Sequence, residues 1–436
     1  MKKKLLQGIS QSIMFLLSRA DAYFSGSVSG MSSEEIKNDP YKDYGILRSR
    51  GKVLRTYRNR GWLALGFEEV QSLFQDPRFG ADMRKNGFVV NMLRMAAAGK
   101  PVSFLDSPTM LNLDPPDHTR LRKLVTKGFV QKTILALEPR IEFIIKNCLD
   151  SYDAASGQFD VMQQLAQPLP VIVIAELLGL PKKDLKRFQE LSEDLLGLTA
   201  LGNDELMDAG AIANAELVSY FEGVIAHKRQ HPDQDMISRL IEAEEEGDRL
   251  NAEELNSTCV VLLIAGHETT ARLIGNGIHL LLQHPDQMEL LRQDPSLMPN
   301  AIEEILRFEP PVQFMVRFAL EDVNFFGKVI KKNQLIMPVI ASANRDPLMN
   351  SNPEKFDIAR QEINHVSFGY GIHLCLGMTL ARLEGRLAIQ LLLERFSHMS
   401  LAEQEIEWSS IPMVRGMESL VINTGETQES EATGVV

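Results

Sequence analysis

The sequence is poor in cysteine, and its basic residues are outnumbered by acidic ones. Three cysteines, Cys148, Cys259 and Cys375, occur among 436 residues. They are too few for a disulfide scaffold, so we expect a reducing compartment, the cytoplasm. The chain has 46 Lys and Arg against 58 Asp and Glu, which gives a net charge of −12. This acidic balance argues against nucleic acid as a general partner.

Long apolar runs are also missing near the N-terminus. The apolar stretch Ile13–Leu17 is much shorter than a membrane-spanning helix, and the polar residues Gln7 and Gln11 come just before it. No clear small-residue cleavage site follows, so we expect neither a signal peptide nor a transmembrane anchor. We expect residues 1–44 to form a mobile N-terminal extension, a frayed amphipathic helix on the domain surface; the alternative is a weak membrane contact through Lys2–Lys4.

No linker rich in Pro, Gly or Ser divides the rest of the chain. Because 44% of the residues are hydrophobic, the chain can bury a large core. Residues 45–424 are therefore predicted to form a single domain, and residues 425–436 a disordered tail. Helical periodicity dominates between residues 116 and 308, and strand patterns follow residue 310. The predicted fold class is mainly α with a minor β lobe.

The longest predicted helix spans Ala252–Leu282, and its centre is apolar all round. This pattern indicates burial inside the protein rather than a membrane span. Two other long helices are predicted at Ile134–Tyr152 and Met378–Phe396. The predicted strands are Val53–Tyr57, Trp62–Leu65, Val312–Phe318, Asn324–Phe326, Leu335–Ile340 and Ser419–Asn423. Residues 80–112 show no sustained periodicity and predict a long loop, which in a compact domain is often functional.

A glycine-rich segment, Phe-Gly-Tyr-Gly-Ile-His-Leu-Cys-Leu-Gly, occupies residues 368–377. It lacks the Gly-Lys-Ser/Thr ending of a phosphate loop and the strand and helix context of a dinucleotide site. Cys375 comes just before a predicted helix, where the helix dipole and free backbone N–H groups favour the thiolate. Such a thiolate is either a nucleophile or a metal ligand. A buried, inert cysteine is the alternative, but burial alone does not explain the surrounding glycines.

A polar segment, Ala-Gly-His-Glu-Thr-Thr, interrupts the long apolar helix at residues 265–270. Polar residues inside such a helix cost free energy unless they are paired or functional. Thr269 can bond back to a carbonyl one turn earlier, and Gly266 leaves space for a ligand. A hydrogen-bonded kink is the structural alternative. The segment is not a zinc-protease motif, because no second His follows four residues after His267.

Charged residues at helical spacing form the remaining candidates. Glu304 and Arg307 lie three residues apart on a predicted helix, a spacing that is usually a surface ion pair. His118 and Arg122 share a face of the helix that follows Pro116, where a solvated helix face is the ordinary interpretation. Arg317 falls in a predicted strand.

Together these motifs resemble the cytochrome P-450 family. Residues 368–377 match the pattern of its cysteine-ligand loop, Phe-Gly-x-Gly-x-His-x-Cys-x-Gly, without departure, and this match is highly specific. Residues 265–270 resemble its oxygen-activation motif, and Glu304 with Arg307 resembles its Glu-x-x-Arg motif. The resemblance runs from about residue 114 to 416. It implies the cytochrome P-450 fold, a triangular, helix-rich prism with haem between the long central helix and the cysteine-loop helix.

The resemblance also implies roles for single residues. Cys375 would be the axial ligand of the iron of haem b, and Glu268 and Thr269 would relay protons to iron-bound dioxygen. Glu304, Arg307 and Arg360 would support the cysteine loop structurally. Four cations would hold the two haem propionates, because buried carboxylates demand charged partners. The implied haem-binding residues are His118, Arg122, Ala265, Arg317, Phe368, Gly369, His373, Cys375 and Gly377.

The implied activity is that of a monooxygenase that uses O2 to hydroxylate or epoxidise a sizeable hydrophobic small molecule. No flavin or nicotinamide domain is apparent, so electrons are expected from a ferredoxin with an NAD(P)H-dependent reductase. A basic docking patch is predicted from Arg120, Lys123, Lys127, Arg382 and Arg386. The alternatives are a peroxide-driven peroxygenase, in which the acid–alcohol pair is typically replaced, and a haem sensor without turnover.

Overall fold

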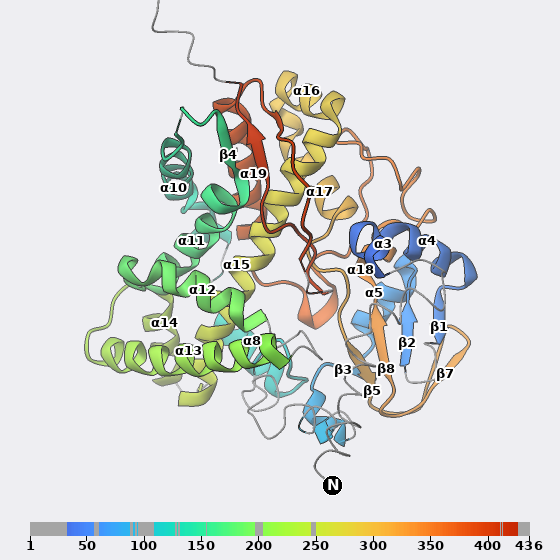
Figure 1. Cartoon of the computed structure of the whole chain (residues 1–436). Helices are drawn as coiled ribbons and strands as arrows, with labels where there is room; N and C mark the ends of the chain where they lie inside the picture. The colour runs from blue at the N-terminus through green and yellow to red at the C-terminus, as the bar shows by residue number, and fades with distance from the viewer. Residues whose placement is uncertain are drawn as a thin grey trace, which may run out of the picture.

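The computed structural model describes residues 33–425 except 56–60, 88–89, 92–93, 95–108, 127–128, 130, 154, 197–203, 246–249, 410 and 412. Helices make up most of this part, and the strands form three small sheets beside them (Figure 1). The predicted fold class is thereby confirmed. No helix in the described ranges is both long and apolar enough to cross a bilayer. The expected surface helix near residues 13–17 and the expected C-terminal tail beyond residue 425 lie outside the description.

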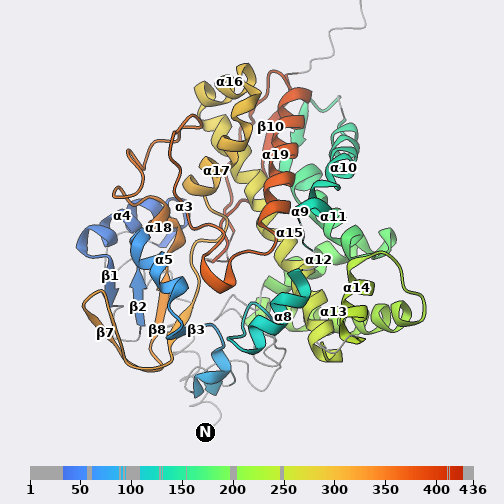
Figure 2. The same ribbon diagram turned by 180° about the vertical axis from the view of Figure 1, so that it is seen from behind.

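Helix α15, Ala252–Gln283, is the central element (Figures 1 and 2). It begins at a capping box, in which the side chain of Asn251 accepts from the backbone of Glu254 and the Glu254 carboxylate accepts in return. Its 32 residues are about 48 Å long. Buried side chains occur on every side of it, as the apolar pattern predicts. The packed neighbours are α11 (Pro168–Leu178), α12 (Leu185–Leu196), α13 (Asp204–Gln230), α17 (Met298–Phe308) and α19 (Met378–Arg395).

Most of the other helices match the sequence pattern closely. One does not: the helix predicted over Ile134–Tyr152 is two helices. The chain turns at Ala136 and Leu137, and Pro139 lies in the first turn of the second helix. The remaining helices are α3 (Ser33–Asn38), α4 (Pro40–Arg50), α5 (Phe67–Gln75), α8 (Asp117–Thr126), α9 (Gln131–Leu135), α10 (Glu138–Asp150), α14 (Met236–Glu245), α16 (Pro285–Gln293) and α18 (Ile340–Asn344).

The β lobe centres on a five-stranded sheet in the order β1-β2-β8-β5-β3. The predicted hairpin is confirmed, and its second strand pairs in parallel with β8. The strand predicted over Val312–Phe318 is shorter than expected: only Arg317–Ala319 joins the sheet, and Val312 makes an isolated bridge to Val414. Likewise, β8 ends at Pro338 because α18 starts at Ile340.

The strands in the described ranges are short. They are β1 (Val53–Arg55), β2 (Gly61–Ala64), β3 (Phe79–Gly80), β4 (Gln158–Asp160), β5 (Arg317–Ala319), β6 (Val323–Phe325), β7 (Lys328–Ile330), β8 (Leu335–Pro338), β9 (Ser400–Leu401) and β10 (Val421–Asn423). Strands β6 and β7 form a hairpin, and the third sheet has the order β4-β10-β9.

The packed part of the chain begins before residue 45. Asp39 caps α4, and both Tyr41 and Tyr44 on this helix are buried. The Arg415 guanidinium donates to the carbonyls of Lys37 and Asn38 at 2.7 and 2.8 Å, which ties α3 to the C-terminal part of the chain. The domain boundary predicted at residue 45 therefore falls inside a packed helix.

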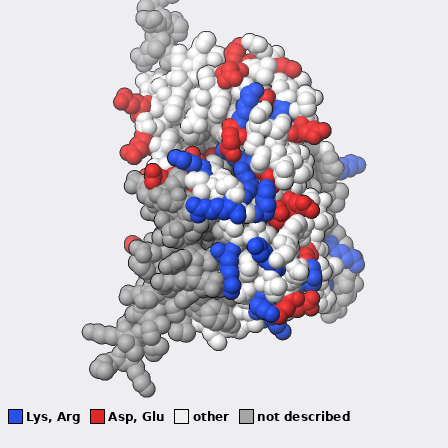
Figure 3. Space-filling view, turned by 90° about the vertical axis from the view of Figure 1, so that its right-hand side faces the viewer, with Lys and Arg blue, Asp and Glu red and all other residues white. Residues whose placement is uncertain are grey.

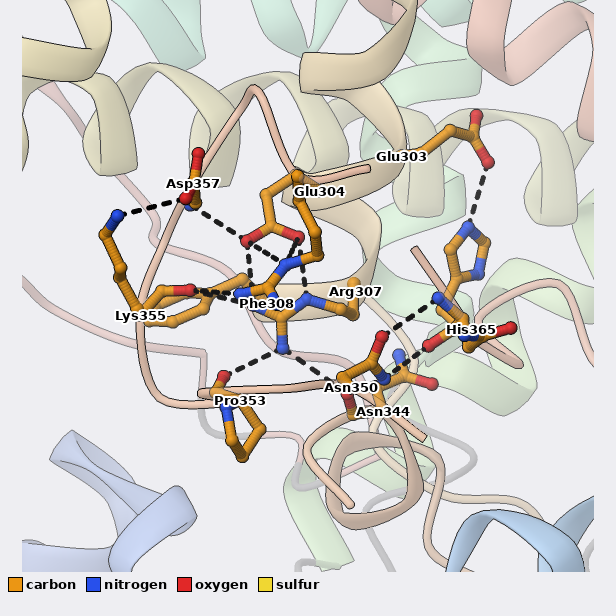
Figure 4. A network of polar contacts seen from close by, with 12 residues as sticks. Glu303, Glu304, Arg307, Phe308, Asn344, Asn350, Pro353, Lys355, Asp357 and His365 are labelled. Carbon is orange, nitrogen blue, oxygen red and sulfur yellow. Dashed lines mark hydrogen bonds and ion pairs between the residues drawn. The ribbon is translucent and has the colours of Figure 1, made fainter. Parts of the chain in front are cut away.

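A fully buried ion pair joins Glu304 and Arg307 on α17 (Figure 4). Its two N–H···O contacts measure 2.7 and 2.8 Å. Arg307 also donates to the carbonyl of Pro353 at 2.8 Å, and Arg360 reaches the same Glu304 carboxylate at 3.2 Å. The backbone N–H of Asp357 is a further donor to it, at 2.9 Å. The pair is therefore buried and structural, as the resemblance implied, and not a surface pair.

We predict that Glu304→Gln lowers the free energy of unfolding by about 3–5 kcal/mol, because two buried arginines would lose their carboxylate. Urea unfolding followed by circular dichroism measures the change. Glu354→Gln is the matched control: that side chain is 59% exposed and pairs with Arg345, so its loss should cost at most about 1 kcal/mol. Equal effects of the two substitutions would contradict the structural role given to the buried pair.

Candidate active site

Backbone hydrogen bonds close the loop from Phe368 to Cys375. The N–H of Cys375 donates to the carbonyl of Phe368 at 2.8 Å, and the N–H of Gly369 donates to Val366 at 2.8 Å. Gly369 and Gly371 both have left-handed backbones, with φ of 71° and 69°. A Cβ on Gly371 would lie 2.6 Å from the carbonyl oxygen of Phe74 at the end of α5. Gly371 thus allows the loop to approach α5 closely.

Burial decides the chemistry of the Cys375 thiol. Its pKa is raised, chiefly by burial, although the backbone N–H groups of Gly377 and Met378 and the cations Arg122 and Arg382 act in the opposite direction. The sequence predicted those N–H groups correctly but not that burial would outweigh them. A thiol with a raised pKa is a poor nucleophile at neutral pH. A metal cation bound at the sulfur would offset the unfavourable effect of burial on the thiolate, so the site favours a metal ligand over a nucleophile.

Four basic groups gather on one side of this loop. The rings of His118 on α8 and His373 lie 4.2 Å apart between centroids. Arg122, one turn along α8 from His118, donates to the carbonyl of Leu374. Arg317 at the start of β5 donates to the carbonyl of its neighbour Val316. Burial, together with Arg317, His118 and Arg122, lowers the pKa of His373 to about 3, so this ring is neutral at physiological pH.

This cluster lacks matching negative charge. Burial lowers the pKa of Arg317 to about 10; among the described residues, the carboxylate that opposes this shift is Asp114, which itself accepts from Ala81 and Lys85. Both ring nitrogens of buried His118 have no hydrogen-bond partner among the described residues. Buried cations without counter-charge are unfavourable unless an anion completes the site. The two propionates of haem would supply that charge, so the residues present fit this group.

An opening in α15 faces the same region. Ala265 is exposed and Gly266 half-buried, although the flanking turns are buried. Leu376, the neighbour of Cys375, packs against the hydrophobic cluster that includes Leu262 and Leu263 of α15. The hydroxyl of Thr269 donates to the carbonyl of Ala265 at 2.9 Å, which confirms the predicted back-bond. A flat ligand between α15 and the cysteine loop would cover Ala265.

The acid of the polar segment is buried and close to neutral. Glu268 is 3% exposed, and burial raises its pKa to about 7 against the attraction of Arg272. An Nη2 of Arg272, one turn later on α15, lies 3.5 Å from a Glu268 oxygen. His267 is also buried, which lowers its pKa to about 3, so it is neutral at physiological pH. An acid with a pKa near 7 can hold and release a proton at neutral pH.

The structure brings together the residues that local patterns identified, and adds others. Arg272 could have been found from its i,i+4 spacing to Glu268, but Glu193 and Glu418, which also influence Glu268, are far away in sequence. Glu303 was missed as well. It holds Arg382 at 2.6 Å, and the guanidinium of Arg382 lies over the Phe368 ring at 4.5 Å.

The predicted basic patch is largely neutralised by ion pairs. Arg120 pairs with Glu254, Arg382 with Glu303, and Arg386 with Glu138. Lys123 is exposed, and Lys127 lies outside the described residues. On the flank seen in Figure 3, basic side chains gather along the middle of the face, and acidic side chains lie mainly around them.

Comparisons with known proteins find similar chains over most of the sequence. The family model described as Cytochrome P450 matches residues 205–423. Cytochrome P450 CYP107DY1 of Priestia megaterium is 41% identical over 347 residues, 78% of this chain and 84% of that protein. Vitamin D(3) 25-hydroxylase of Pseudonocardia autotrophica is 39% identical and covers 89% of this chain and 94% of its own. Among solved structures, the myxobacterial cytochrome P450 CYP267B1 in complex with myristic acid superposes with a TM-score of 0.82 at 35% identity, over 89% of this chain and 97% of that one.

We predict that Arg317→Gln weakens haem retention by about 10- to 100-fold, because one charge-assisted contact to a buried anion is lost. The rate of haem transfer to apomyoglobin measures retention. Arg55→Gln is the control, since Arg55 is an exposed arginine elsewhere in the same sheet. Retention that falls equally in both variants, or in neither, would contradict the role given to Arg317.

Proposed function

This chain belongs to the cytochrome P450 family, and on that premise we propose that it is a monooxygenase that inserts one oxygen atom of O2 into a C–H or C=C bond of a sizeable hydrophobic molecule. The observation that carries the proposal is the Glu268–Thr269 pair. A buried acid with a pKa of about 7 sits beside a hydroxyl on the helix that leaves Ala265 open. A peroxide-driven enzyme or a haem sensor has no need of such a proton source.

Proteins of this family bind haem b, whose iron supplies the oxygen chemistry when bound. We propose that the sulfur of Cys375 would bind the iron and that Phe368, Gly369 and Gly377 shape the loop around the sulfur. Thr269 and Ala265 line the opposite side. The propionates would lie among Arg122, Arg317 and the rings of His118 and His373; both ring nitrogens of His118 lack a hydrogen-bond partner among the described residues.

The protein's own contribution to turnover is proton supply. Insertion of one oxygen atom into RH consumes O2, two electrons and two protons and yields ROH and water. We propose that Glu268 gives up its proton inward, through the hydroxyl of Thr269. Because burial raises the pKa of Glu268 to about 7, this carboxyl can both hold and release a proton near neutral pH.

We propose that the substrate side of the site is apolar and includes several methionines that the family resemblance assigns to it. Met110 and Met417 are buried, and Met83, Met315 and Met413 are half-buried. Methionine adapts to irregular apolar ligands, so a large hydrophobic substrate suits this lining. The relative named for vitamin D(3) and the solved structure with myristic acid both carry the name of a hydrophobic molecule. We propose a substrate of that kind, such as a sterol-like or fatty-acid-like molecule.

Electrons are proposed to come from a separate ferredoxin and its NAD(P)H-dependent reductase. The ion pairs of Arg120, Arg382 and Arg386 reduce the net positive charge available to steer an acidic partner. Docking would therefore depend on ionic strength less than a free basic patch implies. Product formation with NADH, ferredoxin and reductase, compared with product formation from peroxide alone, tests the whole proposal. Product from peroxide only would favour the peroxygenase. No product under either condition would favour the haem sensor.

We predict that Thr269→Ala reduces the product formed per NADH by about tenfold or more, because the inward proton path is cut while oxygen is still consumed. Product yield, NADH oxidation and peroxide release are measured together. Ser257→Ala is a matched control on the same helix: its hydroxyl donates to the carbonyl of Glu253 at 2.7 Å, the same back-bond far from the polar segment. Full coupling in the Thr269 variant would argue against the relay.

We predict that Cys375→Ala abolishes the red-shifted Soret band typical of thiolate ligation in the reduced, CO-bound protein. Absorbance spectra of the purified protein provide the measurement. Cys148→Ala, which removes another cysteine that is not fully exposed, should keep the band. A band that survives loss of Cys375 would exclude it as the iron ligand.

A further inference from the structure

The buried carboxyl of Glu268 on α15 lies against Arg272 and not against the hydroxyl of its neighbour Thr269. A carboxylate oxygen of Glu268 lies 3.5 Å from Arg272, whereas the hydroxyl of Thr269 donates to the carbonyl of Ala265. Consecutive residues on a helix point about 100° apart, so the two groups do not face each other in this arrangement. The Glu268 side chain must therefore turn to pass a proton inward.

Arg272 connects this acid to the surface. Its Nη1 donates to the carbonyl of Met417 at 2.5 Å, and its Nη2 lies 3.4 Å from a carboxylate oxygen of Glu418. The Arg272 side chain is 6% exposed and that of Glu418 is 48% exposed. A Cβ at Gly416 would overlap the aliphatic part of Arg272, so this glycine lets the arginine lie flat against the C-terminal segment.

Both carboxylates approach the same nitrogen of Arg272. Glu268 and Glu418 each have an oxygen within 3.5 Å of that Nη2 atom. Their oxygens are thus close enough for one or two water molecules to join them. The guanidinium has only N–H donors and so orients the two acids without accepting the proton itself.

A third acid, Glu193 on α12, faces the same group. Its pKa is raised by burial, and Glu418 and Asp194 add to this shift while Arg272 and Gln189 oppose it. Around Glu268 the ionisable groups are thus His267 and Arg272 on α15, Glu193 on α12 and Glu418 on the C-terminal segment. Three carboxylates around one guanidinium would carry excess negative charge, so the cluster retains a proton near neutral pH.

We propose that Arg272 and Glu418 form an outer docking station at which Glu268 is recharged with protons from solvent. This inference rests on the proposed monooxygenase function and names the outer half of its proton supply. A hydronium ion of the solvent gives a proton to the Glu418 carboxylate and becomes water; the new O–H bond on Glu418 then breaks as an O–H bond forms on Glu268, and Glu418 returns to its anionic form. No electrons move in this step. Neutral Glu268 is released from Arg272, because its attraction to the guanidinium falls, and turns toward Thr269.

The test compares Glu418→Gln with Glu405→Gln in the haem-loaded protein. Glu405 is an exposed glutamate in the same C-terminal region, so it controls for loss of one surface charge. The first readout is the infrared carboxyl band that disappears in Glu268→Gln, followed across pH. Its midpoint should fall by about one unit in Glu418→Gln, because a carboxylate that raises the pKa of Glu268 is gone, and should stay near 7 in Glu405→Gln.

The second readout is the pH dependence of product formed per NADH. A midpoint lowered by about one unit reduces the protonated fraction of Glu268 at pH 7 roughly fivefold. Coupling in Glu418→Gln should fall to a similar extent at pH 7 and recover at lower pH, and the solvent isotope effect on turnover should rise. Glu405→Gln should match the unmodified protein in both respects.

The outcomes separate this proposal from the proposed function. If product forms from O2 but Glu418→Gln equals Glu405→Gln in both readouts, the docking station is excluded while the monooxygenase stands. If the infrared midpoint falls but coupling and the isotope effect do not change, protons reach Glu268 by another route and the proposal is wrong. If no variant makes product from O2, the function fails, and an infrared midpoint unmoved by Glu418→Gln would then exclude the station as well.

Discussion

The rest of the structure depends on the buried ion pair between Glu304 and Arg307. A pair with no exposure is stable only when every donor and acceptor is satisfied, and here backbone carbonyls and Arg360 complete it. Arg307 also reaches the carbonyl of Asn344, whose side chain accepts from Val366 at 2.9 Å and donates to Ser367 at 2.7 Å. These two residues lead directly into the cysteine loop. A fixed charge on α17 thus sets the position of a thiol about 70 residues later.

The basic groups near the cysteine loop follow the opposite logic. The α17 network is complete within the protein. His118 and Arg317, in contrast, are buried without interactions that fully replace their contacts with water. The packing of α8 and of the β lobe must supply the free energy that holds them there. Binding of a dianionic cofactor would offset this unfavourable free energy, so cofactor affinity and the stability of the loaded protein are coupled. The same residues would lower the stability of a protein that never bound an anion.

Much of the site could be predicted from sequence because its parts have local signatures. The glycine spacing before Cys375 and the polar interruption at Glu268 and Thr269 are each visible within ten residues. The helix break before Pro139 has a local signal too, yet helical periodicity on both sides concealed it. Glu193 and Glu418 had no signal at all: one lies on α12 and the other beyond α19, and only the packing of these segments on α15 brings their charges to Glu268. The ion pairs of Arg382 and Arg386 were hidden for the same reason.

The raised pKa of Glu268 shows how the central helix converts burial into chemistry. A shift from 4.5 to about 7 corresponds to roughly 3 kcal/mol, which is the cost of ionising this carboxyl in place even with Arg272 beside it. The folded protein therefore binds this proton more tightly than the unfolded chain does, so the cost is absent below about pH 4.5, grows as the pH rises and is complete above about 7. Without Arg272 the acid would stay neutral and would not readily give up its proton. With a second cation it would stay ionised and have no proton to give. One guanidinium shared among three carboxylates holds it between these limits, and that balance requires α12, α15 and the C-terminal segment to meet at one point.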